Sequence, residues 1–251
     1  MKLEKLKEIW QFEEEYSFKG WDFSHINGRM KEESVPWDYK KIVQSYMDAE
    51  KVLLDMGTGG GEFLLSLNPT AGKTYATESY LPNIELCKTV LEPFGIELRP
   101  VDDDKNLPFE DNYFDIIINR HESFCISEVR RILKPGGIFI TQQVGERNNR
   151  ELSKFLLGAY PDSTDEDLNL NKVLLQAKDR EMKILNQGEY FPKTYFYDIG
   201  ALVFYAKIIE WEFPGFSVER CFDKLIELQS KLEKKGYIET LEHRYFLVAK
   251  K

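Results

Sequence analysis

The chain has 251 residues, 42% of them hydrophobic, and a formal net charge of −9. A chain of this length and balance buries a full core, which excludes a disordered chain or a fibre. The acidic charge disfavours a nucleic-acid backbone as partner, because such binding depends on clustered lysine and arginine. The longest apolar runs, such as residues 116–118, are too short to cross a bilayer, and the N-terminus lacks the apolar stretch of a signal peptide. We therefore expect a soluble, cytoplasmic protein without membrane association.

The first 49 residues predict a helical cap. Apolar side chains at helical spacing predict a helix over residues 3–16, and a loop rich in aromatic residues follows over residues 20–29. A second helix is expected from about residue 36 to residue 49. The three cysteines, Cys87, Cys125 and Cys221, are far apart and form no CxxC pair, so neither a disulfide nor a metal site is expected.

From residue 51 the pattern alternates between short apolar strands and helices. The strands predicted here span residues 51–56, 75–78, 96–101, 114–119 and 138–144, and the helices between them span residues 62–67, 81–91 and 126–133. Repeated alternation of this kind implies a parallel sheet with helices on both faces, as in doubly wound α/β folds.

The remaining sequence is less regular. Its predicted helices span residues 151–157, 168–177, 198–209 and 218–235, with an exposed acidic loop at 160–167, an extended strand at 182–197 and a last hairpin or strand at 237–250. We assign residues 50–251 to one domain, with lid helices inserted around residues 146–235.

A glycine-rich loop joins the first strand of this domain to its first helix. Its pattern is D-x-G-x-G-x-G, through Asp55, Gly57, Gly59 and Gly61. Glycines there permit a tight turn and let a ligand approach the main-chain N–H groups. The dinucleotide pattern G-x-G-x-x-G would place its third glycine at position 62, which is Glu62, and that charge would repel a pyrophosphate. A glycine-rich turn without any ligand is the alternative.

Glu78 ends the second strand, 19 residues after Gly59. In doubly wound folds, an acid about 20 residues beyond the glycine loop binds a ribose diol. A solvated carboxylate at a strand end is the alternative interpretation.

Four motifs make this chain resemble the class I S-adenosylmethionine-dependent methyltransferases. They are the glycine loop at residues 52–61, Glu78, the segment 101–109 ending in Leu107-Pro108-Phe109 with Phe114-Asp115 after it, and the segment 128–137 ending in Lys134-Pro135-Gly136-Gly137. The resemblance covers about two fifths of the chain, roughly residues 50–145. It implies a Rossmann-like, seven-stranded, mostly parallel sheet, with an N-terminal helical cap, C-terminal lid helices and S-adenosylmethionine as cofactor.

The resemblance also implies roles for individual residues. Those that would hold the methionine end of the cofactor are Asp55, Gly57, Thr58, Gly59 and Gly61, while Glu78 would hold the ribose. Asp103 would contact the adenine amino group, and the backbone N–H of Asp104 would face the ring, although the family usually has a smaller residue there. Asn119 is placed where the family's main chain meets the methionine amino group. The turn at residues 134–137 is expected to be structural.

The acceptor side carries a weaker signal. His121 follows the fourth strand, and ligands of open α/β sheets bind beyond the carboxyl ends of the strands. Its ordinary pKa suits a general base, and a polar loop residue that caps the next helix is an equally open alternative. Aromatic residues gather on both flanks, where the family has its lid, and most of them are expected to pack that lid. Candidate substrate contacts are Trp21, Arg29, Gln143 and Tyr197.

We therefore expect a methyltransferase that acts on a small molecule without a metal. A ribosomal RNA methyltransferase is one alternative, but enzymes of that kind with a similar plan carry an N-terminal four-cysteine zinc module, which this chain lacks. A cofactor-binding module without catalysis is a second alternative. An NAD-dependent oxidoreductase is a distant third, opposed by Glu62.

Overall fold

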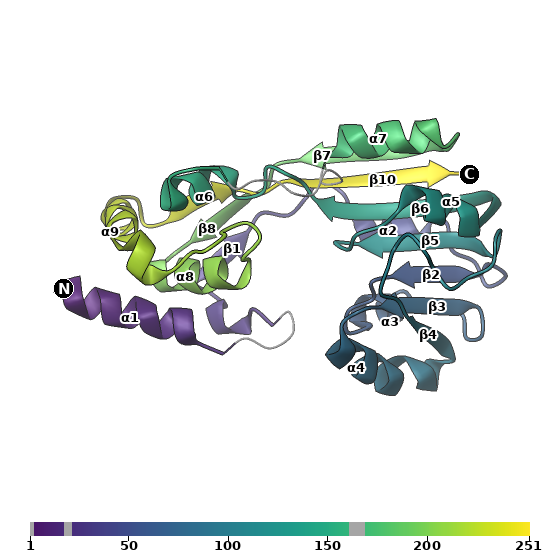
Figure 1. Cartoon of the computed structure of the whole chain (residues 1–251), viewed down its shortest axis with the longest axis horizontal. Coiled ribbons are helices and arrows are strands. Elements are labelled where there is room, and N and C mark those ends of the chain that lie inside the picture. Colours follow the sequence, from purple (N-terminus) through teal and green to yellow (C-terminus); the bar gives the residue numbers. More distant parts are fainter. Residues whose placement is uncertain (1–2, 18–21, 161–168) are drawn as a thin grey trace. The chain divides into compact units, whose positions relative to one another are not determined.

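The computed structural model describes residues 3–17, 22–160 and 169–251, and the chain divides into two compact units (Figure 1). Unit 1 comprises residues 1–35, 146–165 and 191–243, and unit 2 comprises residues 36–145, 166–190 and 244–251. Each unit is therefore assembled from three separate segments of sequence. The division falls at residue 35 rather than at the predicted 49, because helix α2 (Tyr39–Gln44) packs in the core of unit 2.

Unit 2 contains a seven-stranded sheet with the strand order β4-β3-β2-β5-β6-β10-β7. Its strands are β2 (Leu53–Met56), β3 (Thr74–Glu78), β4 (Ile96–Pro100), β5 (Phe114–Arg120), β6 (Leu133–Val144), β7 (Lys183–Tyr190) and β10 (Arg244–Lys250). In this spatial order, each neighbouring pair among β4, β3, β2, β5 and β6 is parallel. Strand β10 is antiparallel to both of its neighbours, β6 and β7. The predicted seven-stranded, mostly parallel sheet is confirmed.

Helices cover both faces of this sheet. Successive strand residues point to opposite faces, so Ile116 and Ile118 join one core while Ile117 joins the other. The helices that share the core of Ile116 are α2, α3 (Glu62–Ser66) and α4 (Leu81–Leu91). Those that share the core of Ile117 are α5 (Ile126–Ile132) and α7 (Leu170–Asp179). The short 3-10 helix η2 (Glu92–Phe94) follows α4 directly.

Unit 1 is built around a three-stranded antiparallel sheet with the order β1-β8-β9. Its strands are β1 (Met30–Glu32), β8 (Lys193–Phe196) and β9 (Ile238–Leu241), and its helices are α1 (Leu3–Glu15), η1 (Ser24–Ile26), α6 (Arg150–Leu157), α8 (Ile199–Ile208) and α9 (Val218–Lys235). Helix α8 is the centre of its core, since eight consecutive residues, 199–206, are buried. Helix α9 ends as predicted, with Gly236 in the left-handed conformation at φ +84°.

Some predicted elements were wrong in extent. The strand expected at 182–197 is two strands, β7 and β8, which belong to different sheets and are separated at Phe191 and Pro192. Residues 237–250 likewise form β9 and β10, which pair with different sheets and not with each other. Helix α2 ends at Gln44 instead of near residue 49. The acidic loop expected at 160–167 lies, apart from Tyr160, outside the described residues.

The segment Lys134-Pro135-Gly136-Gly137 has the structural role expected of it. Leu133 pairs with Phe114 and Ile138 pairs with Ile116, so the four residues between them form an irregularity within β6. Gly136 has φ +83°, a conformation that glycine adopts without strain. No helix in the described part of the chain is both long and apolar enough to cross a membrane.

Candidate cofactor site

The glycine loop after β2 depends on three left-handed residues. Gly57, Gly59 and Gly61 have φ values of +65°, +62° and +85°. A Cβ atom on Gly57 would lie 2.2 Å from Cγ of Glu122, and one on Gly61 would lie 2.7 Å from Cδ2 of Leu91. A Cβ atom on Gly59 would meet nothing within 4 Å. The loop is thus packed closely at both ends and open at its centre, where a ligand can approach the backbone.

Glu78 anchors this loop from the end of β3. The carboxylate is buried, and its Oε2 accepts a hydrogen bond from the backbone N–H of Gly59 at 2.8 Å. Its Oε1 accepts from the N–H groups of Ser79 and Tyr80, both at 2.9 Å. A carboxylate offers about four acceptor positions, and three are used here. The predicted ribose contact remains a prediction, and it would share Glu78 with this anchoring role.

Asp55 and Thr58 are buried polar groups beside the same loop. Burial, together with the carboxylate of Glu78, raises the pKa of Asp55 to about 7. Thr58 is buried beside Asp55, and the hydrogen bond of its side chain to that carboxyl opposes part of the rise in the pKa of Asp55. Buried polar groups in folded proteins are nearly always hydrogen-bonded. Asp55 and Thr58 therefore form a buried polar pair beside the glycine loop.

Two further carboxylates belong to this acidic site. Burial raises the pKa of Asp104 and of Glu122 above their ordinary values. The Ser123 hydroxyl donates to Asp104 Oδ2, and the Glu122 side chain packs against Gly57. Asp103 is exposed, and its Oδ1 accepts from the N–H of Lys105 at 2.9 Å. So many carboxylates around one loop favour a cationic ligand such as one with a sulfonium and an ammonium group.

Asn119 and Gln143 lie in an internal network at the ends of β5 and β6. Both are buried, and the Asn119 Oδ1 accepts from the Thr141 hydroxyl at 2.9 Å and from the Gln143 amide. The Gln143 amide also donates to the carbonyl of Glu122 at 2.9 Å. The Asn119 carbonyl accepts from the Tyr39 hydroxyl at 2.9 Å. The amide that was expected to contact a substrate therefore serves the protein's own structure.

His121 occupies a strained position after β5, with φ +60°. Its Nε2 lies 3.2 Å from Nε2 of Gln142, and the Gln142 Oε1 accepts from the Trp37 indole at 2.8 Å. That second bond turns the Gln142 amide N–H toward the ring, so the imidazole Nε2 is the acceptor. Desolvation and the guanidinium groups of Arg244 and Arg120 lower the pKa of His121, although solvent on its exposed side limits the effect. The ring is neutral at pH 7.

Residues 54–141 match a family model described as a methyltransferase domain. Over these residues the chain is similar to methyltransferase domains. The match agrees with the predicted resemblance over residues 54–141, and S-adenosylmethionine as the cofactor stays a prediction.

Three individual proteins illustrate the match. The phthiotriol/phenolphthiotriol dimycocerosates methyltransferase 2 of Mycobacterium ulcerans is 28% identical over 109 residues, which are 40% of this chain and 42% of that protein. The matched part thus spans less than half of this relative. A Bacillus halodurans protein described as a candidate methyltransferase has a TM-score of 0.61 at 16% identity and covers 85% of this chain and 98% of its own. A Methanosarcina mazei S-adenosylmethionine-dependent methyltransferase has a TM-score of 0.54 at 16% identity, covering 84% and 96%. These two structures share the fold.

The candidate substrate residues outside the methyltransferase domain have diverse environments. Arg29 donates to both carboxylate oxygens of Asp198 at 2.8 and 2.6 Å, and to Glu13 at 2.8 Å, so its guanidinium is paired within unit 1. Tyr197 has an exposed side chain. Trp21 lies outside the described residues. Glu13, which the sequence analysis did not single out, is a buried helix carboxylate whose Oε2 also lies 2.7 Å from Nε2 of His25.

Unit 1 also contains two open hollows. One of about 350 Å³ is lined by Tyr16, Ser17, Asp22, Ser24, His25 and Phe204, and one of about 320 Å³ is lined by Phe23, Met30, Glu32 and Tyr205. Neither of these two hollows includes a residue of the glycine loop. No group of three or more possible metal ligands occurs among the residues that the structure describes.

A first prediction separates backbone strain from packing in the glycine loop. Gly59→Ala introduces only the left-handed strain, which is roughly 1–2 kcal/mol. Gly57→Ala adds the clash with Glu122, about 1–3 kcal/mol more. Urea unfolding of both variants should therefore show Gly57→Ala as the less stable. In a double-mutant cycle, Glu122→Gly, which removes both the Cγ and the Cβ that lies 2.6 Å away, should reduce the cost of Gly57→Ala to that of Gly59→Ala. Additive losses would show that Glu122 does not set the requirement for glycine.

A second prediction concerns the pH dependence of stability. Because the pKa of Asp55 is about 7 in the fold and near 3.9 in an unfolded chain, the folded state binds the extra proton. The stabilisation that comes from protonated Asp55 in the fold is fully present below about pH 4, and it is lost as the pH rises to about 7. Asp55→Asn should therefore gain stability relative to the parent over this window, by at most about 4 kcal/mol.

Unfolding curves at several pH values measure this difference. Asp48→Asn is the control, because the N–H of Glu50 lowers the pKa of that exposed carboxyl and the sign is reversed. Parallel stability curves for the parent and Asp55→Asn would show that the pKa of Asp55 is the same in the folded and unfolded states, which would contradict the prediction.

Proposed function

We propose that this chain transfers a methyl group from S-adenosylmethionine to a small-molecule acceptor. The observation that carries the proposal is the open, left-handed glycine loop of a methyltransferase domain, surrounded by buried carboxylates. This site lies at the carboxyl ends of β2, β3 and β5, which is where open α/β sheets bind their ligands. The Mycobacterium ulcerans relative is named for phthiotriol compounds, which are neither nucleic acids nor proteins. The net charge of −9 also favours a small acceptor over RNA.

The residues of this site suit each part of S-adenosylmethionine. The backbone at Gly57 and Gly59, with Asp55, the Thr58 hydroxyl and the Asn119 main chain, would hold the methionine end. The remaining acceptor position of Glu78 suits a ribose hydroxyl. Asp103 and the N–H of Asp104 would receive the adenine ring. The cofactor supplies a methyl group made electrophilic by a positively charged sulfur.

The transfer requires few steps from the protein. A lone pair of the acceptor forms the new bond to the methyl carbon while the carbon–sulfur bond breaks, and that bonding pair stays on sulfur. The products are the methylated acceptor and neutral S-adenosylhomocysteine. An acceptor that carries a proton loses it to a base or to solvent. Orientation of the acceptor and exclusion of water account for the rate.

His121 is our candidate for that base. Its ring is neutral at pH 7, and its Nε2 lone pair is held by the Gln142 amide, which the acceptor's proton would replace. The three cysteines are free thiols, which supports the cytoplasm as the compartment.

Calorimetry tests the cofactor part of this proposal. S-Adenosylmethionine and S-adenosylhomocysteine should bind, and NAD should not, because Glu62 opens α3 where a pyrophosphate would lie. Glu78→Gln keeps the shape of the side chain but removes one acceptor oxygen, and should weaken binding roughly tenfold to hundredfold. Tight NAD binding would contradict the proposal. Labelled methyl transfer to a small-molecule extract then separates catalysis from binding alone.

The base is tested by His121→Gln once an acceptor is known. We expect kcat to fall about 10²–10⁴-fold with cofactor affinity nearly unchanged. In the parent, kcat should rise with pH through an inflection below the ordinary histidine pKa of about 6.5, and this inflection should vanish in the variant. His25→Gln is the comparison, since it changes a histidine that is paired with Glu13. A variant with normal kcat, or with equally damaged cofactor binding, would remove His121 from catalysis.

A further inference from the structure

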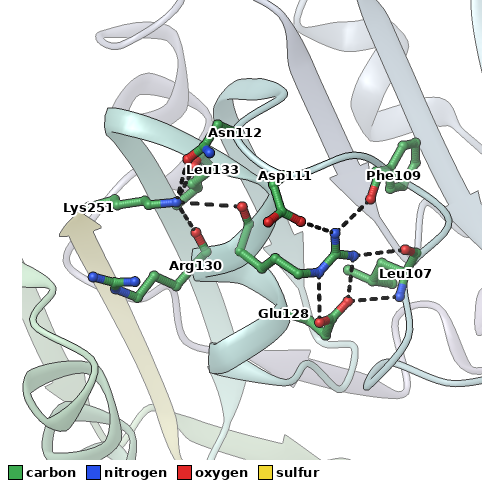
Figure 2. A network of polar contacts seen from close by, with 9 residues as sticks. Leu107, Phe109, Asp111, Asn112, Glu128, Arg130, Leu133 and Lys251 are labelled. Carbon is green, nitrogen blue, oxygen red and sulfur yellow. Dashed lines mark hydrogen bonds and ion pairs between the residues drawn. The ribbon is translucent and has the colours of Figure 1, made fainter.

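The segment that follows β4 carries Asp103 and Asp104 and is held from outside by helix α5. Arg131 donates from Nη2 to the carbonyl of Leu107 at 3.0 Å and from Nη1 to the carbonyl of Phe109 at 2.8 Å. Glu128 accepts from the N–H of Leu107 at 3.0 Å. Figure 2 shows the carbonyls of Leu107 and Phe109 directed toward this one helix. We call Glu128 and Arg131 the clamp.

The clamp uses every donor of its arginine. Arg131 Nε and Nη2 also meet the two carboxylate oxygens of Glu128 at 2.9 and 2.7 Å, and Nη1 meets Asp111 at 2.8 Å. A guanidinium has five N–H donors in a fixed plane, and five acceptors surround this one. The paired carboxylates raise the pKa of Arg131, and the guanidinium lowers that of Glu128. A lysine cannot reproduce this fork.

Two other cations strengthen the same attachment. Arg99 of β4 donates to the carbonyl of Pro108 at 2.5 Å, so two guanidinium groups bind the three successive carbonyls of residues 107–109. Lys251 donates to the carbonyls of Arg130 and Leu133, each at 2.6 Å, and to Asn112 at 2.8 Å, which fixes the C-terminal end of α5 (Figure 2). The helix that carries the clamp is therefore itself held in place.

The clamp binds the backbone of Leu107, which is four residues beyond Asp103 in the same loop. Asp103 itself is exposed: its side chain accepts from the N–H of Lys105 at 2.9 Å, and its carbonyl accepts from the N–H of Asn106 at 3.1 Å. Recognition of a fixed donor on a ring requires the carboxylate to be placed within a fraction of an ångström. A carboxylate on a short exposed loop reaches that accuracy only if the loop is anchored nearby.

We propose that Glu128 and Arg131 are positioning residues that give the methyltransferase domain its selectivity for adenine. The inference rests on the proposed function, because it assigns Asp103 to the adenine amino group. It adds that this recognition is set through Leu107 and Phe109 by a helix that does not touch the cofactor.

The experiment compares two ligands that differ only at the purine. S-Adenosylhomocysteine carries the 6-amino donor, and S-inosylhomocysteine carries a carbonyl there, which a carboxylate repels. Calorimetry on the full chain should give a preference for the adenine ligand of about tenfold or more. Arg131→Gln should reduce that ratio toward one, as should Asp103→Ala. Arg130→Gln is the matched control: the adjacent arginine on the same helix pairs with Glu181 at 3.2 Å and should leave the ratio unchanged.

The outcomes separate the inference from the proposed function. If Arg131→Gln weakens both ligands equally and keeps the ratio, the clamp is only structural and the inference is overturned. If the parent binds S-adenosylhomocysteine without preferring it, Asp103 does not read the amino group and the inference is overturned while the cofactor assignment stands. Failure of the parent to bind either ligand overturns both.

A milder variant guards against misfolding. Arg131→Lys keeps the charge with fewer aligned donors, so its ratio should fall between those of the parent and Arg131→Gln. Hydrogen exchange of the peptide around residues 104–113 should rise in the same order and should not rise in Arg130→Gln. An unchanged ratio and unchanged exchange in a folded Arg131→Lys would also contradict the inference.

Discussion

The hydrogen bond from the Gly59 N–H to the Glu78 carboxylate is the interaction on which the cofactor site depends. It ties the centre of a loop with three left-handed glycines to the end of the neighbouring strand. Gly57 and Gly61 on either side are closely packed by Glu122 and Leu91, whereas a Cβ atom on Gly59 would meet nothing within 4 Å. The strain of that conformation is compensated by these contacts, and the exposed backbone is left for a ligand.

Charge is the second constraint on this site. Asp55, Glu78, Asp104 and Glu122 converge within one unit, and burial raises the pKa of three of them. Buried carboxylates without a cation oppose folding, because each loses hydration and repels the others. A ligand with a sulfonium and an ammonium group relieves that cost. The acidic site therefore trades stability of the free protein for affinity, as functional sites commonly do.

The loops of the cofactor site are joined to one another and not only to the sheet. The segment after β5 meets the glycine loop through Glu122 and meets Asp104 through Ser123. Helix α5, which follows that segment, holds residues 107–109 through Glu128 and Arg131. The motifs at residues 101–109 and 128–137 thus appear together in the sequence because they are physical partners in the fold.

The sequence by itself determined the alternation of strands and helices over residues 51–144. These features are local: helix α4 and helix α9 have the predicted bounds, since apolar spacing and a terminal glycine act within a few residues. The spacing of Gly57, Gly59 and Gly61 likewise reports a backbone conformation that side chains other than glycine resist.

Tertiary structure alone decided which strands share a sheet and which polar groups are free. Periodicity cannot show that the chain leaves one sheet for another between β7 and β8, because both halves are extended. It also cannot show that Arg29 is paired with Asp198, 169 residues away, or that Gln143 is bound to Asn119. Whether a charged or amide side chain meets a ligand or the protein depends on distant residues, and only the folded chain brings those residues together.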